Sequence, residues 1–244
     1  MLVSVIPQSP RERLAIGVLS TTQLTEAVAT QGALHCVSRL RKPGNYRPRY
    51  LSYLAGRAII SGLLKRENLA LRVEPDLRYG FLRLVTSAGE VTLERFVNVS
   101  HTQGMAVAAL GPTPIGIDVE SLSRDATRAL GRVTSEGDLL TLPPTVVVSD
   151  QVVSASLALW CAKEAISKAL GLGIVFGMNH FHVDFSQASP YPVVTDITGP
   201  LTVKNPAISF TIRGTYLFAV CTSRENFLKP VDWIDDDEIL RLSY

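Results

Sequence analysis

The spacing of apolar residues in the first half of the chain predicts one long helix followed by strands. Leu54, Ile60 and Leu64 form an apolar stripe at helical spacing, which predicts a helix from about Pro48 to Asn68. Beyond this helix, strand-like apolar runs are expected at residues 81–86, 91–97, 105–110 and 115–120.

The second half of the chain contains a second long helix. Leu159, Ala162, Ile166 and Ala169 fall on one face at a period of 3.6, which predicts a helix from about residue 154 to Leu170. Later strands and a short acidic closing helix are expected, the strands at residues 181–185, 207–213 and 217–222. Glycines and prolines interrupt the preceding segment, 121–149, which is expected to hold one short helix at 126–133.

Two short sequences echo each other across the halves. Leu54-Ala-Gly-Arg-Ala-Ile-Ile-Ser in the first helix is similar to Cys161-Ala-Lys-Glu-Ala-Ile-Ser in the second. Each helix is followed by paired strands that contain an Ala-Val step. The sequence therefore predicts a duplicated α+β unit, with halves at 1–114 and 115–244 and a ligand site at the seam. Because one chain supplies both halves, we expect a monomer.

Composition and charge narrow the possible partners. The 244 residues are 46% hydrophobic and 19% charged, which is ordinary for a globular protein, and a net charge of +2 is too small to indicate nucleic-acid binding. Between Arg39 and Arg57 there are six cations and no acid. This cluster suits a phosphorylated small molecule or an acidic partner, although a solvated basic face would have the same composition.

The location is expected to be cytoplasmic. Three widely spaced cysteines give neither a disulfide framework nor a zinc-binding pattern. The first residues lack the basic region of a signal peptide, and no apolar run reaches the length of a membrane span, so no membrane association is expected.

The most informative short sequence is Ile-Gly-Ile-Asp-Val-Glu at residues 115–120. In a strand, Asp118 and Glu120 project from one face while Ile117 and Val119 project from the other. Two carboxylates spaced by roughly 7 Å suit a divalent cation with oxygen ligands. A solvated edge strand would show the same alternation, so a third carboxylate is needed to decide between the two.

The second helix carries that candidate. At 100° per residue, Glu164 and Lys168 lie nearly opposite the apolar stripe, with Lys163 beside them. They could be a routine surface pair. Alternatively, the helix supplies a metal ligand and the positive charges that balance phosphate oxygens.

A Ser-His pair occurs in the sequence Asn98-Val-Ser-His-Thr. Neighbouring residues of a strand point to opposite faces, so His101 cannot readily deprotonate Ser100, and no G-x-S-x-G motif is present. We therefore expect a phosphate or hydroxyl contact from His101, or an ordinary turn histidine, in preference to a catalytic triad.

Taken in order, these motifs resemble the Sfp-type 4′-phosphopantetheinyl transferases. The resemblance rests on Ala55-Gly-Arg57, Asn98-Val-Ser-His101, Gly116-Ile-Asp-Val-Glu120 and Trp160-x-x-Lys163-Glu164-x-x-x-Lys168. It implies an α+β fold of two similar α/β halves related by a pseudo-twofold axis. It also implies transfer of phosphopantetheine from coenzyme A to a serine of an apo-acyl or apo-peptidyl carrier protein, with release of adenosine 3′,5′-bisphosphate.

The resemblance also assigns roles to individual residues. It implies that Asp118, Glu120 and Glu164 hold Mg²⁺, which Mn²⁺ could replace, and that Glu164 is the candidate base for the carrier serine. The remaining implied contacts are with coenzyme A: Ser100 and His101 with phosphate, Lys163 and Lys168 with the diphosphate and the reacting phosphoryl group, and Arg49 and Arg57 with the 3′-phosphoadenosine end. Lys168 would also stabilise or protonate the leaving group.

Two departures from the family pattern affect the expected partners. Where many relatives carry a G-K-P or W-P element, this chain has Tyr79-Gly-Phe-Leu-Arg, so the basic contact expected there is unassigned, with Arg78 and Arg83 as the candidates. The segment 121–150, which helps to dock the carrier in relatives, has little of the family pattern. Two other functions remain open: a non-catalytic protein that binds coenzyme A or a carrier, and a Mg²⁺-dependent nucleotide phosphohydrolase.

Overall fold

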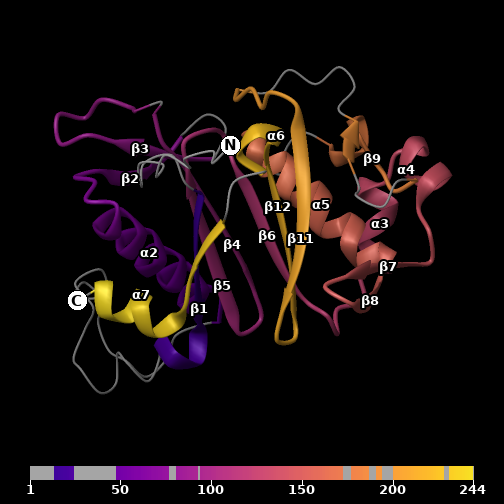
Figure 1. The fold of residues 1–244 in the computed structure, drawn as a ribbon, viewed down its shortest axis with the longest axis horizontal. Coiled ribbons are helices and arrows are strands. Elements are labelled where there is room, and N and C mark those ends of the chain that lie inside the picture. The colour runs from indigo at the N-terminus through magenta and orange to yellow at the C-terminus, as the bar shows by residue number, and fades with distance from the viewer. Residues whose placement is uncertain are drawn as a thin grey trace, which may run out of the picture.

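The fold is built on two β-sheets, each covered on one face by a long helix (Figure 1). The computed structural model describes residues 14–24, 48–76, 81–92, 94–172, 177–186, 191–193, 200–227 and 231–243. The side chains of a few residues within these ranges, Arg49 among them, are also outside the description.

The first sheet has the strand order β13-β1-β5-β4. β5 runs antiparallel to both of its neighbours, and β13 runs parallel to β1. The elements of this part are β1 (Leu14–Ser20), α2 (Pro48–Arg66), β2 (Arg72–Pro75), β3 (Leu82–Val85), β4 (Phe96–Thr102), β5 (Met105–Gly111), β13 (Val231–Ile234) and α7 (Asp236–Ser243). α2 packs on the sheet, and α7 packs on α2.

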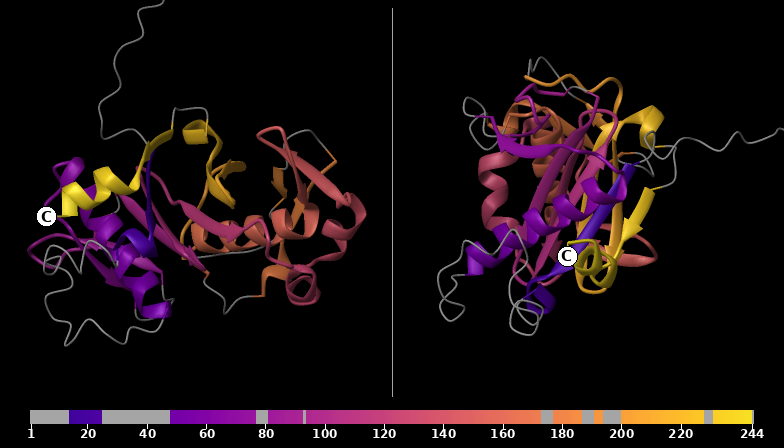
Figure 2. Two further views of the ribbon diagram at one scale, coloured as in Figure 1. Left: turned by 90° about the horizontal axis from the view of Figure 1, so that it is seen from below. Right: turned by 90° about the vertical axis from the view of Figure 1, so that its left-hand side faces the viewer.

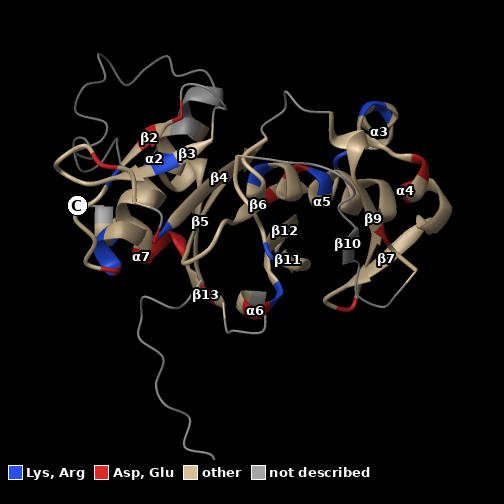
Figure 3. Ribbon diagram, turned by 90° about the horizontal axis from the view of Figure 1, so that it is seen from above, with Lys and Arg blue, Asp and Glu red and all other residues tan. Residues whose placement is uncertain are grey.

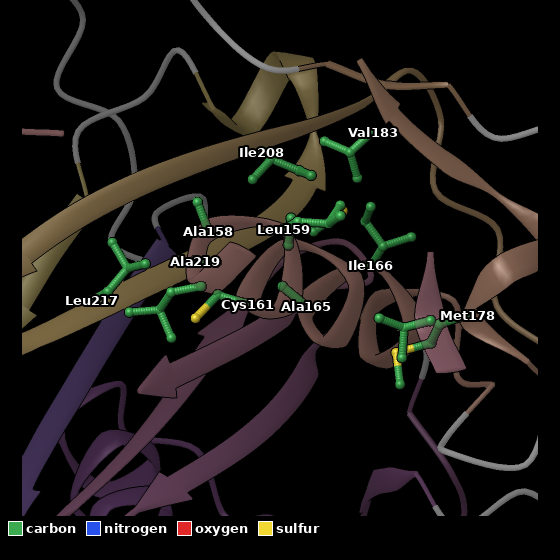
Figure 4. Close-up of a cluster of buried hydrophobic side chains, with 14 of the residues drawn as sticks. Ala158, Leu159, Cys161, Ala165, Ile166, Met178, Val183, Ile208, Leu217 and Ala219 are labelled. Atoms are coloured by element: carbon green, nitrogen blue, oxygen red, sulfur yellow. The ribbon is translucent and has the colours of Figure 1, made fainter. Parts of the chain in front are cut away.

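The second sheet has the order β11-β12-β6, again with antiparallel neighbours. Its part of the chain contains β6 (Gly116–Ser121), α3 (Thr127–Val133), α4 (Glu136–Thr141), β7 (Thr145–Val148), β8 (Gln151–Ser154), α5 (Ala155–Ala169), η3 (Met178–His180), β9 (His182–Asp184), β10 (Tyr191–Val193), β11 (Pro206–Arg213), β12 (Tyr216–Ser223) and α6 (Arg224–Phe227). α5 covers this sheet. Apolar side chains of the helix and of the sheet pack together in one buried cluster, among them Ala158, Leu159, Ile208, Leu217 and Ala219 (Figure 4).

Alternation along the strands gives each sheet two buried faces. On β5, Ala106 and Ala108 pack toward α2, whereas Val107 and Ala109 face the second sheet. A third apolar cluster, which includes Val107 and Phe218, therefore joins the two sheets. Strands buried on both faces read as continuous apolar runs, which explains the composition of β5 and β12.

The order of elements in the first sheet recurs in the second. β1 precedes α2 and then pairs with β5, the second strand of the β4–β5 hairpin. β6 precedes α5 and pairs in the same way with β12, the second strand of the β11–β12 hairpin. The main difference is the α3–β8 segment between β6 and α5, which lies at the end of the molecule opposite α7 (Figures 1 and 2).

Most predicted elements are confirmed, but the strand expected at 91–97 is wrong. Val91 makes only an isolated bridge with Val85, and the regular strand begins at Phe96. Between them, the buried guanidinium of Arg95 pairs with Glu67 at the end of α2, at 3.0 Å. Arg95 thus ties the chain to the residue that follows α2 just before β4 begins. In the described part of the chain, no helix is both long and apolar enough to span a membrane.

Candidate active site

The edge strands β4 and β6 lie next to each other where the two sheets meet (Figure 1), and polar side chains of the two strands form hydrogen bonds with each other there. Ser100 Oγ on β4 donates a hydrogen bond to Asp118 Oδ1 on β6 at 2.7 Å. Two residues further along each strand, Thr102 Oγ1 donates to Glu120 Oε2 at 2.9 Å. The two-residue period of both strands thus aligns two hydroxyls with two carboxylates.

Both carboxylates are buried, which excludes the solvated edge strand that the sequence left open. Asp118 is 3% exposed and Glu120 is 5% exposed. A buried carboxylate requires charge-assisted partners, because its desolvation is costly. The site is therefore a network of paired charges.

Gly116 allows the second helix to lie against these carboxylates. A Cβ at this position would overlap the carbonyl oxygen of Ala165 and lie 2.5 Å from the amide nitrogen of Ala169, both on the α5 backbone. Only glycine permits this approach of helix to strand. The Gly in the Gly-Ile-Asp-Val-Glu motif therefore sets the distance between the acids of β6 and the charged residues of α5. Figure 3 shows basic positions in blue and acidic positions in red on α5, next to β6.

Lys168 of α5 is the cation at the centre of the network. Its Nζ lies 2.7 Å from Asp118 Oδ1, and it donates to Ser100 Oγ at 2.8 Å and to the Ile117 carbonyl at 3.1 Å. The side chain retains partial exposure, so it bridges the buried acid and solvent. The structure thus brings three of the predicted site residues, Ser100, Asp118 and Lys168, into direct contact.

The second oxygen of Asp118 has unused bonding capacity. Oδ2 is buried, and no described group donates a hydrogen bond to it. Burial, together with the neighbouring Asp118 carboxylate, raises the pKa of the Cys161 thiol well above its ordinary value, so Cys161 stays neutral. A buried carboxylate oxygen that accepts no hydrogen bond is available to bind a cation.

Glu120 is held by two residues that the sequence reasoning did not assign. Trp160 Nε1 donates to Glu120 Oε1 at 3.0 Å, and Arg124 forms an ion pair with the same oxygen. The Arg124 guanidinium also stacks on the Trp160 ring, 4.7 Å from its centroid. The spacing of four residues between Glu120 and Arg124 was the available signal, but it carries meaning only if the strand ends between them.

Glu164 stands at the margin of this network. Its Oε2 lies 3.8 Å from Lys168 Nζ, and its side chain is partly buried. Burial raises the pKa of Glu164 above the ordinary glutamate value, Lys168 opposes this shift, and Asp118 adds to it. A carboxyl group with a raised pKa is suited to accept a proton near neutral pH.

The donor set fits a hard divalent cation in its chemistry. Asp118, Glu120 and Glu164 offer carboxylate oxygens, and Asp118 Oδ2 lacks a partner among the described residues. Across the residues that the structure describes, however, no three His, Cys, Asp or Glu side chains already converge as a metal site. In this structure Asp118 forms an ion pair with Lys168, and Glu120 forms one with Arg124.

Lys163 does not join the network. Expected beside Glu164 on the open face, it is 0% exposed and forms an ion pair of 2.7 Å with the equally buried Asp138 of α4. Nζ also donates to the carbonyls of Met178, at 3.1 Å, and Phe181. The surroundings of Lys163 thus differ from those expected of a diphosphate contact, because its charge is neutralised inside the second half.

Ser100 and His101 point to opposite faces of β4, as strand geometry requires. Ser100 is buried in the carboxylate network, whereas His101 is exposed and lines a cavity of about 220 Å³. Arg57 of α2 lines the same cavity, whose walls are mostly apolar. The two residues expected to contact phosphate therefore lie in different surroundings: Ser100 in the carboxylate network and His101 at the cavity.

Several of the expected basic contacts lie outside the described part. The side chain of Arg49 is outside the described residues, as are Arg78 and most of the cation cluster that begins at Arg39. Arg83 is described and lies within ion-pair distance of Asp76, at 3.5 Å. Its charge is thus already balanced by an acid that directly follows β2.

Part of the chain is similar in sequence to known proteins. Residues 114–221, which include Asp118, Glu120, Glu164 and Lys168, match the 4′-phosphopantetheinyl transferase superfamily. The chain is 28% identical over 111 residues to the 4′-phosphopantetheinyl transferase gsp of Aneurinibacillus migulanus, covering 46% of each chain. It is 24% identical over 147 residues to the transferase Sfp of Bacillus subtilis (strain 168), covering 59% of this chain and 62% of that protein.

A third relative extends the comparison. The transferase psf-1 of Bacillus pumilus is 26% identical over 147 residues, covering 59% of each chain. The aligned part spans about half to three-fifths of the length of these curated relatives. The resemblance found in the sequence is thus confirmed over residues 114–221, the part of the chain that matches the 4′-phosphopantetheinyl transferase superfamily.

Proposed function

We propose that this protein transfers the 4′-phosphopantetheine group of coenzyme A to a serine of an apo-carrier protein and releases adenosine 3′,5′-bisphosphate. The main support is the Lys168–Asp118–Ser100 cluster next to Glu164, at the seam between the two sheets. A phosphoryl transfer requires positioned charges more than covalent help from the enzyme, and this cluster supplies them.

In this proposal, Asp118, Glu120 and Glu164 hold Mg²⁺, or Mn²⁺ in its place. The bound metal would neutralise the negative charge of the diphosphate. Lys168, already hydrogen-bonded to Ser100, contacts phosphate oxygens and stabilises the leaving group. Glu164 is the candidate base that accepts the proton of the carrier serine.

The cavity lined by Arg57 and His101 is the proposed place for the phosphorylated adenosine end of coenzyme A. Its apolar walls, which include Ile60 and Val99, suit a flat ring, and its two basic side chains suit a phosphate. Arg49, eight residues before Arg57 on α2, is proposed as a further contact with the phosphorylated adenosine end of coenzyme A. Lys163 is omitted from the proposed coenzyme A contacts, because its charge is paired inside the protein.

The carrier partner is proposed to dock on the α3–β8 segment. Leu139 and Leu140 of α4 are 68% and 86% exposed, and Val147 and Val152 of the β7–β8 hairpin are also exposed. Large exposed apolar side chains commonly mark interaction surfaces. An acyl or peptidyl carrier of polyketide or nonribosomal peptide biosynthesis is the proposed class of partner.

The architecture is proposed to consist of two similar halves, 1–114 and 115–244, related by a pseudo-twofold axis. The recurrent connectivity around α2 and α5 supports this, with β13 and α7 returning to the first half. Because one chain supplies both sides of the site, the proposed state is a monomer, and the proposed location is the cytoplasm.

Product analysis tests the proposed reaction against its alternatives. The protein is incubated with coenzyme A, Mg²⁺ and an apo-acyl or apo-peptidyl carrier, and both carrier mass and nucleotide products are measured. Transfer predicts one phosphopantetheinyl group on the carrier serine and an equal amount of adenosine 3′,5′-bisphosphate. Nucleotide cleavage that is independent of the carrier would indicate a phosphohydrolase. The absence of any product, with coenzyme A bound, would indicate a non-catalytic binding protein.

A further inference from the structure

Arg124 occupies the carboxylate that is expected to bind metal. It pairs with Glu120 Oε1, an oxygen that also accepts the indole hydrogen bond of Trp160. The other oxygen, Oε2, accepts from Thr102. Both oxygens of Glu120 are therefore already engaged, and Arg124 supplies the positive charge that the buried carboxylate requires.

A tight turn after β6 places Arg124 there. The amide of Arg124 donates to the carbonyl of Ser121 at 2.9 Å, and the hydroxyls of Ser121 and Ser123 are 2.8 Å apart. The chain thereby reverses direction, so a residue four positions beyond Glu120 returns over it. Stacking on the Trp160 ring holds the guanidinium in that position.

A guanidinium and a divalent cation cannot both neutralise Glu120 at close range. Two positive groups a few ångströms apart repel each other, and the repulsion is strong where water is largely excluded. Arg124 remains about one-third exposed, so its side chain has an open path into solvent. By contrast, the hydrogen bonds from Trp160 and Thr102 carry no formal charge and are compatible with a bound metal.

We propose that Arg124 is a resident counter-ion that competes with the divalent cation for Glu120, so that metal loading displaces its guanidinium from the carboxylate. This inference rests on the proposed function in one respect, which is that Glu120 is a metal ligand. It also accounts for the absence of a converged metal site among the described acids: Arg124 and Lys168 stand in for the metal charge.

Binding of Mn²⁺ alone tests the competition without coenzyme A or a carrier. Free Mn²⁺ is measured by electron paramagnetic resonance during titration of the wild-type protein, Arg124→Gln and Arg128→Gln. Arg128 is the matched control, because it lies on the exposed surface of α3 and its replacement removes the same charge. When Arg124 pairs with Glu120 in most molecules, only a minor fraction of the sites is open to Mn²⁺. Removing this competitor in Arg124→Gln should therefore tighten Mn²⁺ binding about tenfold. Arg128→Gln should bind as wild type does.

Fluorescence of Trp160 provides a second readout, recorded in a Trp233→Phe background so that one tryptophan remains. Mg²⁺ should change the emission of Trp160 as the guanidinium leaves its ring, and the change should be largely lost when Arg124→Gln is added. Equal or weaker Mn²⁺ binding by Arg124→Gln would overturn the proposal, as would the absence of Mn²⁺ binding to any variant. The transferase proposal is judged separately by carrier mass, so failure of the competition alone leaves it intact.

Discussion

Lys168 on α5 and Asp118 on β6 form an ion pair of 2.7 Å across the contact between helix and strand. Ser100 of the first sheet bridges the pair, because its hydroxyl donates to Asp118 and accepts from Lys168. Three residues from three elements therefore share one hydrogen-bonded cluster. A change in any of them alters both the packing of the halves and the charge of the site.

Removal of the cation from this pair should destabilise the protein. Lys168→Met leaves the buried Asp118 carboxylate without its counter-ion, which should lower the free energy of unfolding by about 1–3 kcal/mol. The pair is partly exposed, so the loss stays below that of a fully buried pair. Urea unfolding measures it, with the exposed Lys204→Met as the matched control. If the loss in Lys168→Met/Asp118→Asn equals the sum of the two single losses, the pair is not coupled.

Gly116→Ala should separate α5 from β6. The added methyl group would overlap the backbone of α5 at Ala165, and backbone atoms cannot move aside as a flexible side chain can. We expect a loss of about 3 kcal/mol or more in unfolding free energy, together with weaker divalent-cation binding in the folded fraction. Gly131→Ala is the control, because a Cβ there would meet no atom within 4 Å. Equal stability of the Gly116→Ala and Gly131→Ala variants would contradict the close approach.

Lys163 should prove to be a structural residue. Lys163→Met leaves the wholly buried Asp138 carboxylate unpaired, and breaking such a pair should lower the free energy of unfolding by about 3–5 kcal/mol. The KM for coenzyme A in the remaining folded enzyme should stay near the wild-type value. A raised KM with unchanged stability would restore the diphosphate contact expected from the sequence.

Glu164 should make stability depend on pH in a specific direction. Burial raises the pKa of this carboxyl group, so the folded state binds its proton more tightly than the unfolded state does. This contribution is present below the ordinary glutamate pKa and is lost as pH rises through the raised value. In metal-free buffer, the stability of wild type relative to Glu164→Gln should therefore fall as pH rises above the ordinary glutamate pKa of about 4.3. A constant or rising difference would exclude a raised pKa.

The sequence predicted the elements of the site better than their contacts. Both long helices and the strand with Asp118 and Glu120 lie within two residues of their expected bounds. By contrast, β13 was not predicted. It is short and half-buried, and its parallel pairing with β1 exists only in the folded chain. Local periodicity carries no information about such a partner.

The limits of periodicity are clearest on α5. A single apolar stripe predicted Lys163 near the open face, but α4 and β9 cover that side of the helix and bury the charge against Asp138. Arg124 was missed for a similar reason, since its contact with Glu120 depends on a turn formed by Ser121 and Ser123. In both cases one member of the ion pair, Asp138 or Arg124, lies in the segment between β6 and α5, whose sequence has little regular pattern.

The most direct test of the proposed function is the intact mass of a purified apo-carrier after incubation with coenzyme A and Mg²⁺. The wild-type protein should add one phosphopantetheinyl group to the carrier serine, Asp118→Asn should add almost none, and Lys204→Met should match wild type. Asp118→Asn keeps the size of the side chain but removes the charge that pairs with Lys168 and would bind the metal. No mass gain on acyl and peptidyl carriers alike, or an equal gain with Asp118→Asn, would contradict the account.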